Sequence, residues 1–404
     1  MKIAVFHNLM SGGNKKFLYH TVKGFKQYGH RVTVYNLSIS NERFSSLKDF
    51  ADEIVTQPLF PVEPTGLLKL VAPPLQILQL APLLQANRRI ATAINQGDYD
   101  IVWVVNCFLT QHPLVLRYLE KPYILYTAEH FRAYYDRVLW RRPQQLCGKG
   151  KLGLTLRQLY LRSAVAARAQ VDKLAMAQVT NVYCNSYFTA ENIMRYYAVP
   201  AQPIYPGVDI AEYRELDIPR ENLVLSVGAF SPLKGHDFVL EALTTIRPEK
   251  RPKLVIIADR VDSLAERHRC ESFAKDHSVD LEIMTNITEE NLVAVFNRAK
   301  LTLCANILEP FGMVPHESMA CGTPVVAVRE GGFRETVIDG QTGMLVPRDP
   351  KSMGEAVSHL LEDEELRRTL CRNGVAHVRR HHTHAHYFAQ VEEALHELVG
   401  TRSR

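Results

Sequence analysis

The feature that most constrains the fold of this chain is an alternation of short apolar runs with amphipathic helical segments. In the first half, an apolar run at Ile3–Phe6 precedes a loop, a helical pattern and a β-branched run at Arg31–Tyr35. A strand, helix and strand joined by short connections are typical of parallel sheets in α/β proteins. Further elements are predicted as strands over Ile101–Val105, Tyr123–Tyr126 and Val182–Cys184, and as a long helix over Leu152–Ala177.

The second half follows the same order of elements. Strands are predicted at Leu223–Val227, Lys253–Ile257, Leu281–Met284, Leu301–Cys304 and Val325–Val328, with helices between them. Proline, glycine and a change of composition coincide near Pro203–Asp209. A chain of 404 residues is long enough for two sizeable cores. The pattern therefore predicts two doubly wound α/β domains, over residues 1–205 and 206–386, followed by a terminal helix in 387–404.

Charge is distributed unevenly between the two predicted domains. The net charge is +5, but residues 1–205 carry a net +12 and residues 206–404 a net −7. Such an asymmetry indicates that the two halves face different partners.

Cysteine spacing and hydropathy narrow the class of protein. The seven cysteines are scattered and form no Cys-x-x-Cys pair, which argues against a disulfide framework and indicates a reducing compartment. The amino-terminal stretch lacks the apolar segment of a signal peptide. The most apolar window, Leu67–Leu84, contains three prolines and Lys69, so no membrane-spanning helix is expected. We expect a cytoplasmic protein, either free or peripheral on the cytoplasmic face of a membrane.

Two glycine-bounded turns follow predicted strands and are candidates for phosphate binding. Gly12 and Gly13 follow the first strand, and Gly228 follows Leu223–Val227 and precedes Lys234. Backbone amides can approach an anion closely where no Cβ intervenes, and a lysine meets a phosphate as a point charge. By spacing alone, a flexible turn and a solvated lysine explain these residues about equally well.

The segment from Glu309 to Glu317 is the most informative part of the sequence. Glu309 lies at the end of a predicted strand, and Gly312, Met313 and Val314 form the predicted start of a helix, whose free amides favour an anion. Glu317 follows about one turn later. Two carboxylates around a group of amides suit a ligand with hydroxyls at both ends and a phosphate between. Helix capping alone would explain Glu309 but not the whole arrangement.

The sequence resembles retaining glycosyltransferase family four, a group of the GT-B fold, over essentially its whole length. Its most specific segment runs from Glu309-Pro310-Phe311-Gly312 through Glu317 to Ala320-Cys321-Gly322-Thr323-Pro324. The resemblance implies two Rossmann-like domains that face each other across a cleft. The first would bind the acceptor and the second the nucleotide sugar, and residues 387–404 would cross back onto the first domain.

By position, the resemblance assigns roles to individual residues. Glu309 would hold hydroxyls of the donor sugar, Glu317 the ribose hydroxyls, and Lys234 the diphosphate. The further substrate-binding candidates are the glycines and helix-start residues Gly12, Gly13, Gly228, Phe311, Gly312, Met313 and Val314. No metal or other cofactor is expected, because lysine and helix amides would replace the cation.

Two departures from the family pattern affect these roles. Ala229 stands where many members carry an arginine, which makes Lys234 more important. In the first domain, the histidine of many relatives would fall on Ala128, so that Glu129 or His130 is the candidate catalytic residue there. The sequence leaves open which of the two acts.

Two metal-like patterns are interpreted as structural. Asp98-Tyr99-Asp100 fits a metal-binding Asp-x-Asp pattern but reads as a polar turn before a strand. A histidine tract lacks a companion Asp/Cys cluster and is interpreted as a solvated connector between helices rather than a metal site. Its members are His377, His381, His382, His384 and His386.

The resemblance implies a retaining, metal-independent hexosyltransferase that moves a sugar from a nucleotide diphosphate sugar to an acceptor hydroxyl. Acceptor sugars and glycolipids are the candidate acceptors. The alternatives are a sugar-nucleotide isomerase (epimerase) of the same architecture and a non-catalytic membrane-binding protein. The base is expected to be read by backbone near Met284–Ile287, and neither base nor sugar nor acceptor is identified by the sequence.

Basic and apolar residues of the first half suggest contact with an anionic membrane. They comprise the apolar segment Thr65–Ile90 with its Arg88-Arg89 end and a basic cluster between Arg137 and Arg168. The alternative is an internal helical hairpin with solvated charges. Nucleic acid is not an expected partner, because no aromatic-basic recognition module is visible.

Overall fold

The computed structural model describes the chain except for residues 11, 43–44, 60–78, 137–150, 259–262 and 401–404. Two compact units are present. Unit 1 comprises Met1–Asn185, Thr189–Ile204 and Gln390–Arg404, and unit 2 comprises Ser186–Phe188 and Tyr205–Ala389. The short excursion Ser186–Phe188 into unit 2 was not part of the predicted domain division.

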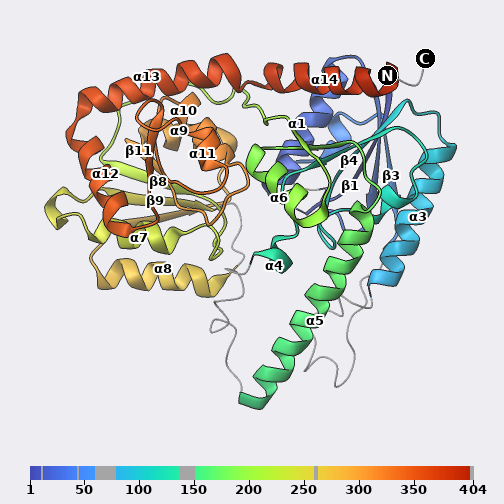
Figure 1. Ribbon diagram of the computed structural model, residues 1–404. Coiled ribbons are helices and arrows are strands. Elements are labelled where there is room, and N and C mark those ends of the chain that lie inside the picture. Colours follow the sequence, from blue (N-terminus) through green and yellow to red (C-terminus); the bar gives the residue numbers. More distant parts are fainter. Residues whose placement is uncertain (11, 43–44, 60–78, 137–150, 259–262, 401–404) are drawn as a thin grey trace. The chain divides into compact units, whose positions relative to one another are not determined.

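Unit 1 is built on a parallel seven-stranded sheet with the order β3-β2-β1-β4-β5-β6-β7 (Figure 1). Its strands are β1 (Lys2–Asn8), β2 (Arg31–Leu37), β3 (Glu53–Gln57), β4 (Ile101–Cys107), β5 (Tyr123–Thr127), β6 (Val182–Cys184) and β7 (Gln202–Pro203). The central strand β4 is buried along its whole length, as expected for a parallel sheet that is covered on both faces.

The helices of unit 1 complete its core. They are α1 (Gly13–Gln27), α3 (Leu80–Gln96), α4 (Arg132–Tyr135), α5 (Lys151–Met176) and α6 (Tyr187–Tyr197). Trp103 of β4 is fully buried, and its ring packs against Phe25 of α1 and Tyr126 of β5 at centroid distances of 5.4 and 5.7 Å. The last helix, α14 (His384–Gly400), ends in unit 1, where His30 Nε2 donates to Glu392 Oε1 at 2.7 Å.

Unit 2 contains a parallel six-stranded sheet with the order β10-β9-β8-β11-β12-β13. Its strands are β8 (Leu223–Val227), β9 (Lys253–Ala258), β10 (Leu281–Thr285), β11 (Leu301–Cys304), β12 (Val325–Val328) and β13 (Gly343–Val346). Its helices are α7 (His236–Thr244), α8 (Leu264–Asp276), α9 (Glu289–Arg298), α10 (Met313–Ala320), α11 (Phe333–Thr336), α12 (Pro350–Glu362) and α13 (Glu364–His381). Within this unit, α7 and α8 lie on one side of the sheet and α9, α10 and α11 on the other (Figure 1). The prediction of two parallel α/β sheets is confirmed.

The strand order of each sheet reverses at one place, which in open α/β sheets is the usual place for a ligand. In unit 1 the reversal lies between the neighbouring strands β1 and β4, and in unit 2 between β8 and β11. Open α/β sheets bind ligands outside the carboxyl ends of the strands at this point. The turns after β1, β8 and β11 carry Gly12, Gly228 and Glu309, respectively.

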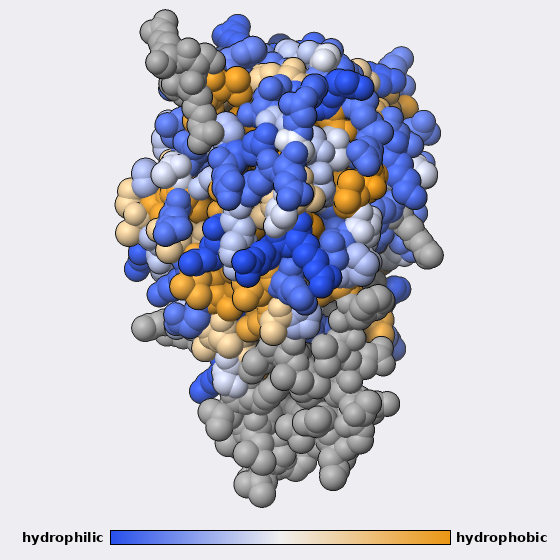
Figure 2. All heavy atoms as spheres, turned by 90° about the vertical axis from the view of Figure 1, so that its right-hand side faces the viewer, coloured by the Kyte–Doolittle hydropathy of each residue, from blue (hydrophilic) through white to orange (hydrophobic). Residues whose placement is uncertain are grey.

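The residues predicted to contact a membrane are described only in part. Residues 60–78 and 137–150 lie outside the described residues. Within α3, Leu83 is fully buried while Arg88 and Arg89 are exposed. No helix among the described residues combines the length and apolar character needed to cross a bilayer. On the face shown in Figure 2, the described hydrophobic residues form separate groups among hydrophilic ones.

Candidate active site

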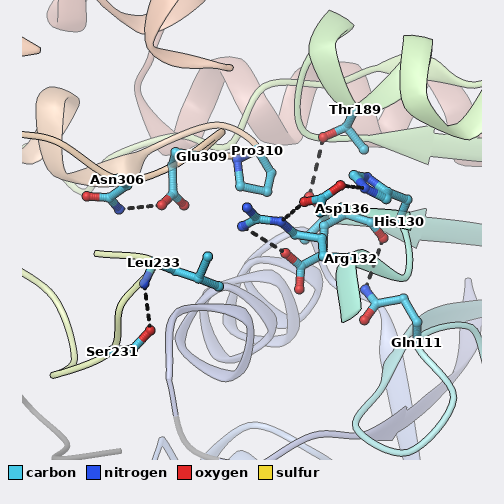
Figure 3. A network of polar contacts seen from close by, with 12 residues as sticks. Gln111, His130, Arg132, Asp136, Thr189, Ser231, Leu233, Asn306, Glu309 and Pro310 are labelled. Atoms are coloured by element: carbon cyan, nitrogen blue, oxygen red, sulfur yellow. Dashed lines mark hydrogen bonds and ion pairs between the residues drawn. The ribbon is translucent and has the colours of Figure 1, made fainter. Parts of the chain in front are cut away.

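A lysine and a glutamate meet at the point where the sheet order of unit 2 reverses. Lys234, in the loop after β8, places its Nζ 3.1 Å from Oε2 of Glu309, in the loop after β11. Asn306 Nδ2 donates to the same carboxylate oxygen (Figure 3). The side chains of Lys234 and Glu309 are 32% and 18% exposed, so a ligand can reach both. When a ligand binds, the Lys234 ammonium can pair with a phosphate in place of Glu309. The Glu309 carboxylate can then accept a hydrogen bond from a sugar hydroxyl.

Two glycines hold the turn that carries Lys234. Gly228 has a φ of +153°, and a Cβ on it would lie 3.1 Å from Cγ and Cδ of Lys234, so the lysine stem packs against bare backbone. Gly235 directly precedes α7 with a φ of +69°, and a Cβ on it would lie 2.2 Å from the carbonyl oxygen of Ala305. The loops after β8 and β11 are therefore in backbone contact, and this contact places Lys234 beside Glu309.

A buried histidine forms hydrogen bonds that hold the same turn in place. His236 Nε2 donates to the carbonyl oxygen of Gly228 at 3.1 Å, and its Nδ1 lies 2.9 Å from the hydroxyl of Ser226. Burial lowers the pKa of His236 to about 4, so the imidazole is neutral at pH 7 and can fill both roles.

This depressed pKa predicts acid sensitivity. The unfolded chain protonates His236 near pH 6.5, whereas the folded chain does so only near pH 4. The contribution of neutral His236 to the free energy of unfolding is therefore fully present above pH 6.5 and is lost as the pH drops toward 4. Between pH 7 and pH 4.5, we expect His236 to account for a loss on the order of 2–3 kcal/mol in the free energy of unfolding. Urea denaturation at both pH values should show a smaller loss in His236→Gln; an equal loss in both proteins would contradict the assignment.

The loop after Glu309 leads into α10 with a tightly fixed backbone. Gly332 N donates to the carbonyl oxygen of Glu309 at 2.7 Å. Phe311 is buried, and its ring stacks on Tyr205 at a centroid distance of 5.6 Å. Gly312 precedes the helix with a φ of +91°, where a Cβ would lie 2.6 Å from the ring of Phe333. The half-buried Met313 and Val314 form the first turn of α10, whose amides have no partner within the helix.

Glu317 lies further along α10 in a group of acidic and phenolic side chains. It is 8% exposed. Burial, together with the charges of Glu317 and Glu289, raises the pKa of Tyr213 far above its usual value. Tyr213 donates its hydroxyl to Glu289 Oε2 at 2.5 Å. Because α9 begins at Glu289 shortly after β10, Glu289 is close in sequence to Met284–Ile287, the backbone expected to contact the base.

In unit 1, the glycine pair lies at the start of α1 in an open position. Gly12 has a φ of +119° and Gly13 is the first residue of the helix. No described atom lies within 4 Å of a Cβ built on either glycine, so a ligand can approach this backbone closely. The geometry suits the predicted role in anion binding.

The structure separates the environments of Glu129 and His130. His130 is buried and donates from Nε2 to Asp136 Oδ1 at 2.6 Å, and Arg132 Nε donates to the other oxygen of Asp136 at 2.8 Å (Figure 3). Burial alone would raise the pKa of Asp136, but these hydrogen bonds outweigh it and lower the pKa. The Glu129 side chain is 30% exposed and lies 3.9 Å from Arg132 Nη1. A ligand can therefore reach Glu129, whereas the His130 ring is committed to a buried hydrogen bond with Asp136.

A buried network near the glycine pair was missed by the sequence analysis. Lys15 is 1% exposed, and its Nζ lies 2.6 Å from Oε1 of Glu42, which is also 3.1 Å from Nε2 of His7. Burial lowers the pKa of Lys15 and brings that of His7 to about 4. Burial opposes ionisation of Glu42, but His7 and Lys15 lower its pKa to about 2. The only signal in the sequence was the position of Lys15 two residues after the glycine pair.

The two metal-like patterns have different outcomes. Asp98 pairs with the side chain of Lys2, and Asp100 Oδ2 accepts from the Lys2 amide at 2.6 Å, at the amino end of β4, as expected for a polar turn. The interpretation of the histidine tract as a solvated connector is wrong for His382, which is 7% exposed. The neighbouring His377 is half-buried.

One member of the predicted basic cluster in unit 1 has a structural role. Arg168 on α5 donates from Nε to the carbonyl oxygen of Leu109 and from Nη2 to that of Phe108 at 3.3 Å. Its guanidinium also lies over the ring of Phe131 at 5.2 Å from the centroid. Its charge is therefore committed to the interior of unit 1, contrary to the prediction of a membrane contact.

Comparisons with known proteins agree with this architecture. A family model described as Glycosyltransferase Family 4 matches residues 11–212, and one described as Glycosyl transferases group 1 matches residues 211–377. The D-inositol 3-phosphate glycosyltransferase of Acidothermus cellulolyticus is 37% identical over 187 residues, which cover 44% of this chain and 42% of that protein. The enzyme of the same name from Corynebacterium efficiens is 31% identical over 195 residues, 44% and 46% of the two chains. The matched stretch thus spans less than half the length of these relatives.

Solved structures share the fold. Sucrose-phosphate synthase from Thermosynechococcus elongatus superposes with a TM-score of 0.74 at 18% identity, over 99% of this chain and 100% of that chain. HepE from Anabaena, in complex with UDP and glucose, gives a TM-score of 0.69 at 18% identity over 98% and 100%. The two matching family models together span most of both units, and the chain belongs to Glycosyltransferase Family 4.

Proposed function

We propose that this chain is a glycosyltransferase that moves a hexose from a nucleotide diphosphate sugar to an acceptor hydroxyl and retains the anomeric configuration. The observation that carries the proposal is the Lys234–Glu309 pair at the reversal point of the unit 2 sheet, next to the first turn of α10. HepE, which has the same fold, is described in complex with UDP-glucose and with UDP. This supports UDP-sugars as the first donors to test.

The reaction places negative charge on the departing diphosphate, and unit 2 offers positive charge there. In this proposal, the ammonium of Lys234 leaves Glu309 and pairs with the phosphate. The amides of Gly312, Met313 and Val314 add partial positive charge. Groups fixed before the reaction stabilise the leaving group without having to reorganise. Glu309, released by Lys234, accepts hydrogen bonds from the sugar hydroxyls, and Glu317 accepts those of the ribose.

The proposed route needs neither a metal ion nor an enzyme nucleophile. Lys234 and the amides of α10 supply the charge that a divalent cation would otherwise provide. The acceptor hydroxyl attacks the anomeric carbon from the face that the diphosphate leaves, and the departing phosphate takes the hydroxyl proton. The bond to the acceptor oxygen forms as the bond to the phosphate oxygen breaks, so the configuration is retained.

We assign the substrate contact of unit 1 to Glu129, and to His130 a positioning role through Asp136 and Arg132. The exposure of the Glu129 carboxylate and the burial of the His130 ring support this division. Gly12 and Gly13 offer their amides to the diphosphate from this unit.

This division predicts the effect of a substitution at Glu129. Glu129→Gln keeps the shape but removes the charge, and we expect turnover to fall about 100-fold, as for a carboxylate that interacts with the reacting groups. The free energy of unfolding should not change, because the side chain is partly exposed. Steady-state rates and urea denaturation measure the two effects. Glu120→Gln, at an exposed position of the same unit, is the matched control. Wild-type turnover in Glu129→Gln would contradict the assignment.

The proposed function is tested with a panel of UDP-, GDP- and ADP-sugars, each with and without sugar and glycolipid acceptors. We expect acceptor-dependent release of nucleoside diphosphate without added divalent metal, and a product whose anomeric configuration, measured by NMR, matches that of the donor. Inversion would overturn the retaining mechanism. Conversion of the donor without an acceptor would indicate an isomerase, and absence of both turnover and nucleotide-sugar binding by calorimetry would indicate a non-catalytic protein.

We also propose that unit 1 brings the enzyme to an anionic membrane surface on the cytoplasmic side, where a glycolipid acceptor would lie. The net charge of +12 over residues 1–205 and the exposed Arg88 and Arg89 support this. Each basic residue near such a surface contributes about 1 kcal/mol. Flotation with vesicles containing anionic lipid at low salt tests the proposal, and failure to float would remove it.

A further inference from the structure

Three histidines from two separate parts of the sequence meet inside unit 2. His316 lies on α10, His377 on α13, and His382 directly after the end of α13. One ring nitrogen from each lies within 4.8 Å of those of the other two. Nε2 of His382 is 3.1 Å from Nε2 of His377, and the rings of His316 and His382 stack at a centroid distance of 4.1 Å. We call this group the histidine cluster.

Three buried nitrogens of the histidine cluster have no hydrogen-bond partner among the described residues. His316 is fully buried, and neither of its ring nitrogens has a hydrogen-bond partner in the part of the chain that the structure describes. Nδ1 of His382 has none there either. A buried polar atom without a partner costs about 1–3 kcal/mol, and such atoms in a native protein point to water or an ion. An apolar side chain at position 316 would carry no such cost.

The chemistry of the cluster selects one class of ligand. Two nitrogens that bind the same zinc ion, each at about 2.0–2.1 Å in tetrahedral geometry, lie about 3.3 Å apart. The distance between His377 and His382 is already close to this value, at 3.1 Å. Metals bind the neutral imidazole, and burial favours this form by lowering the pKa of His316 and bringing that of His382 to about 3. Three nitrogen donors suit zinc and its transition-metal neighbours, whereas Mg²⁺ and Ca²⁺ prefer oxygen.

We propose that His316, His377 and His382 form a binding site for a divalent transition-metal ion, with Zn²⁺ as the preferred ion and water as the fourth ligand. The half-buried His377 and its exposed neighbour His381, whose rings are 5.4 Å apart, provide a route from solvent. The ion would replace the contact between His377 and His382 and give His316 a partner.

The bound ion would link elements on which the donor site depends. Glu317, assigned above to the ribose, follows His316 on α10. On the other side, the carbonyl oxygen of His382 accepts from the amide of Val208 at 2.8 Å, and His384 N donates back to Val208 O at 3.1 Å. Metal binding would therefore tie α10 to the end of α13 and to the segment at Val208. Because the ion binds the folded chain, it should stabilise unit 2 whether or not the enzyme transfers sugars.

The test uses tag-free, metal-stripped full-length protein and Zn²⁺ alone as the probe. Isothermal titration should show one tight site per chain, and the melting temperature should rise with Zn²⁺ concentration. Co²⁺ in its place should give the intense visible absorption of a tetrahedral site. We expect His377→Gln and His382→Gln to weaken Zn²⁺ binding more than about 100-fold, because loss of a ligand exceeds the 10–100-fold effect of losing a supporting residue.

Two further variants test whether binding requires the buried histidines rather than an exposed one, and whether loss of binding is separate from loss of folding. His381→Gln changes the exposed neighbour and should keep wild-type affinity. His316→Leu should lose the site, yet without metal it should be at least as stable as the wild type, because it removes two unpartnered nitrogens. Absence of stoichiometric Zn²⁺ binding by the wild type would overturn the proposal and leave the cluster as packed neutral imidazoles. Unchanged binding by His377→Gln, or equal loss in His381→Gln, would also overturn it.

Discussion

Replacing Lys234 with alanine is expected to lower turnover by about 100- to 1000-fold, the range measured when a group that stabilises developing negative charge is removed. The reason is its position: its ammonium lies 3.1 Å from Glu309, at the end of the sheet where the diphosphate is proposed to leave. Ala229, which follows Gly228, carries no charge, so Lys234 bears more of the positive charge near this turn. The free energy of unfolding should change little, since the side chain is one-third exposed. Nucleoside diphosphate release and thermal unfolding measure the two quantities.

A lysine elsewhere in unit 2 provides the control for this prediction. Lys253 pairs with Glu282 at 2.7 Å and begins β9, so it lies at the amino ends of the strands. Lys253→Ala should keep wild-type turnover. Glu309→Ala should also lose most activity, and combining it with Lys234→Ala should cost less than the two effects added, because both residues act on one donor. A folded Lys234→Ala variant with wild-type turnover would refute the role of the lysine.

The sequence predicted the interior strands of the fold and one edge strand, β10, well, but it missed the other three edge strands. The predicted and observed bounds of β8 and β11 are identical, because strands buried on both faces are continuous apolar runs. The edge strands β3, β7 and β13 were not predicted. Strand β3 is half-exposed and β7 has two residues, one of them a proline, so neither shows an apolar run. Strand β13 begins with a glycine, so its apolar run is short.

The candidate site was predictable where its residues are adjacent in the sequence, and otherwise only through the resemblance. Spacing indicated amides at the start of α10, but the contact between Lys234 and Glu309 exists because β8 and β11 are neighbours in the sheet. The histidine tract was misinterpreted for the same reason. The partner that buries His382 is His316, which lies on another helix and has no marker in the local sequence.

Gly235→Ala is expected to be the most damaging small substitution in unit 2. An alanine at its φ of +69° costs about 1–2 kcal/mol, and its methyl group would lie 2.2 Å from the carbonyl oxygen of Ala305. The oxygen belongs to the backbone just after β11 and has no free rotation by which to yield. The loops must therefore separate, against the hydrogen bond from Ile307 N to Leu233 O at 2.8 Å. We expect the free energy of unfolding to fall by about 3 kcal/mol or more.

The same separation would move Lys234 away from Glu309, and a displacement of about 1 Å at a reacting group can cost 100-fold in rate. Gly340→Ala is the matched control, because Gly340 has a nearly equal φ of +71° but no described atom within 4 Å of its missing Cβ. That variant should lose only the 1–2 kcal/mol of backbone strain and keep its turnover. Urea denaturation and nucleoside diphosphate release, measured on both variants, separate strain from contact. Equal losses in the two would show that the approach of Gly235 to Ala305 does not position the lysine.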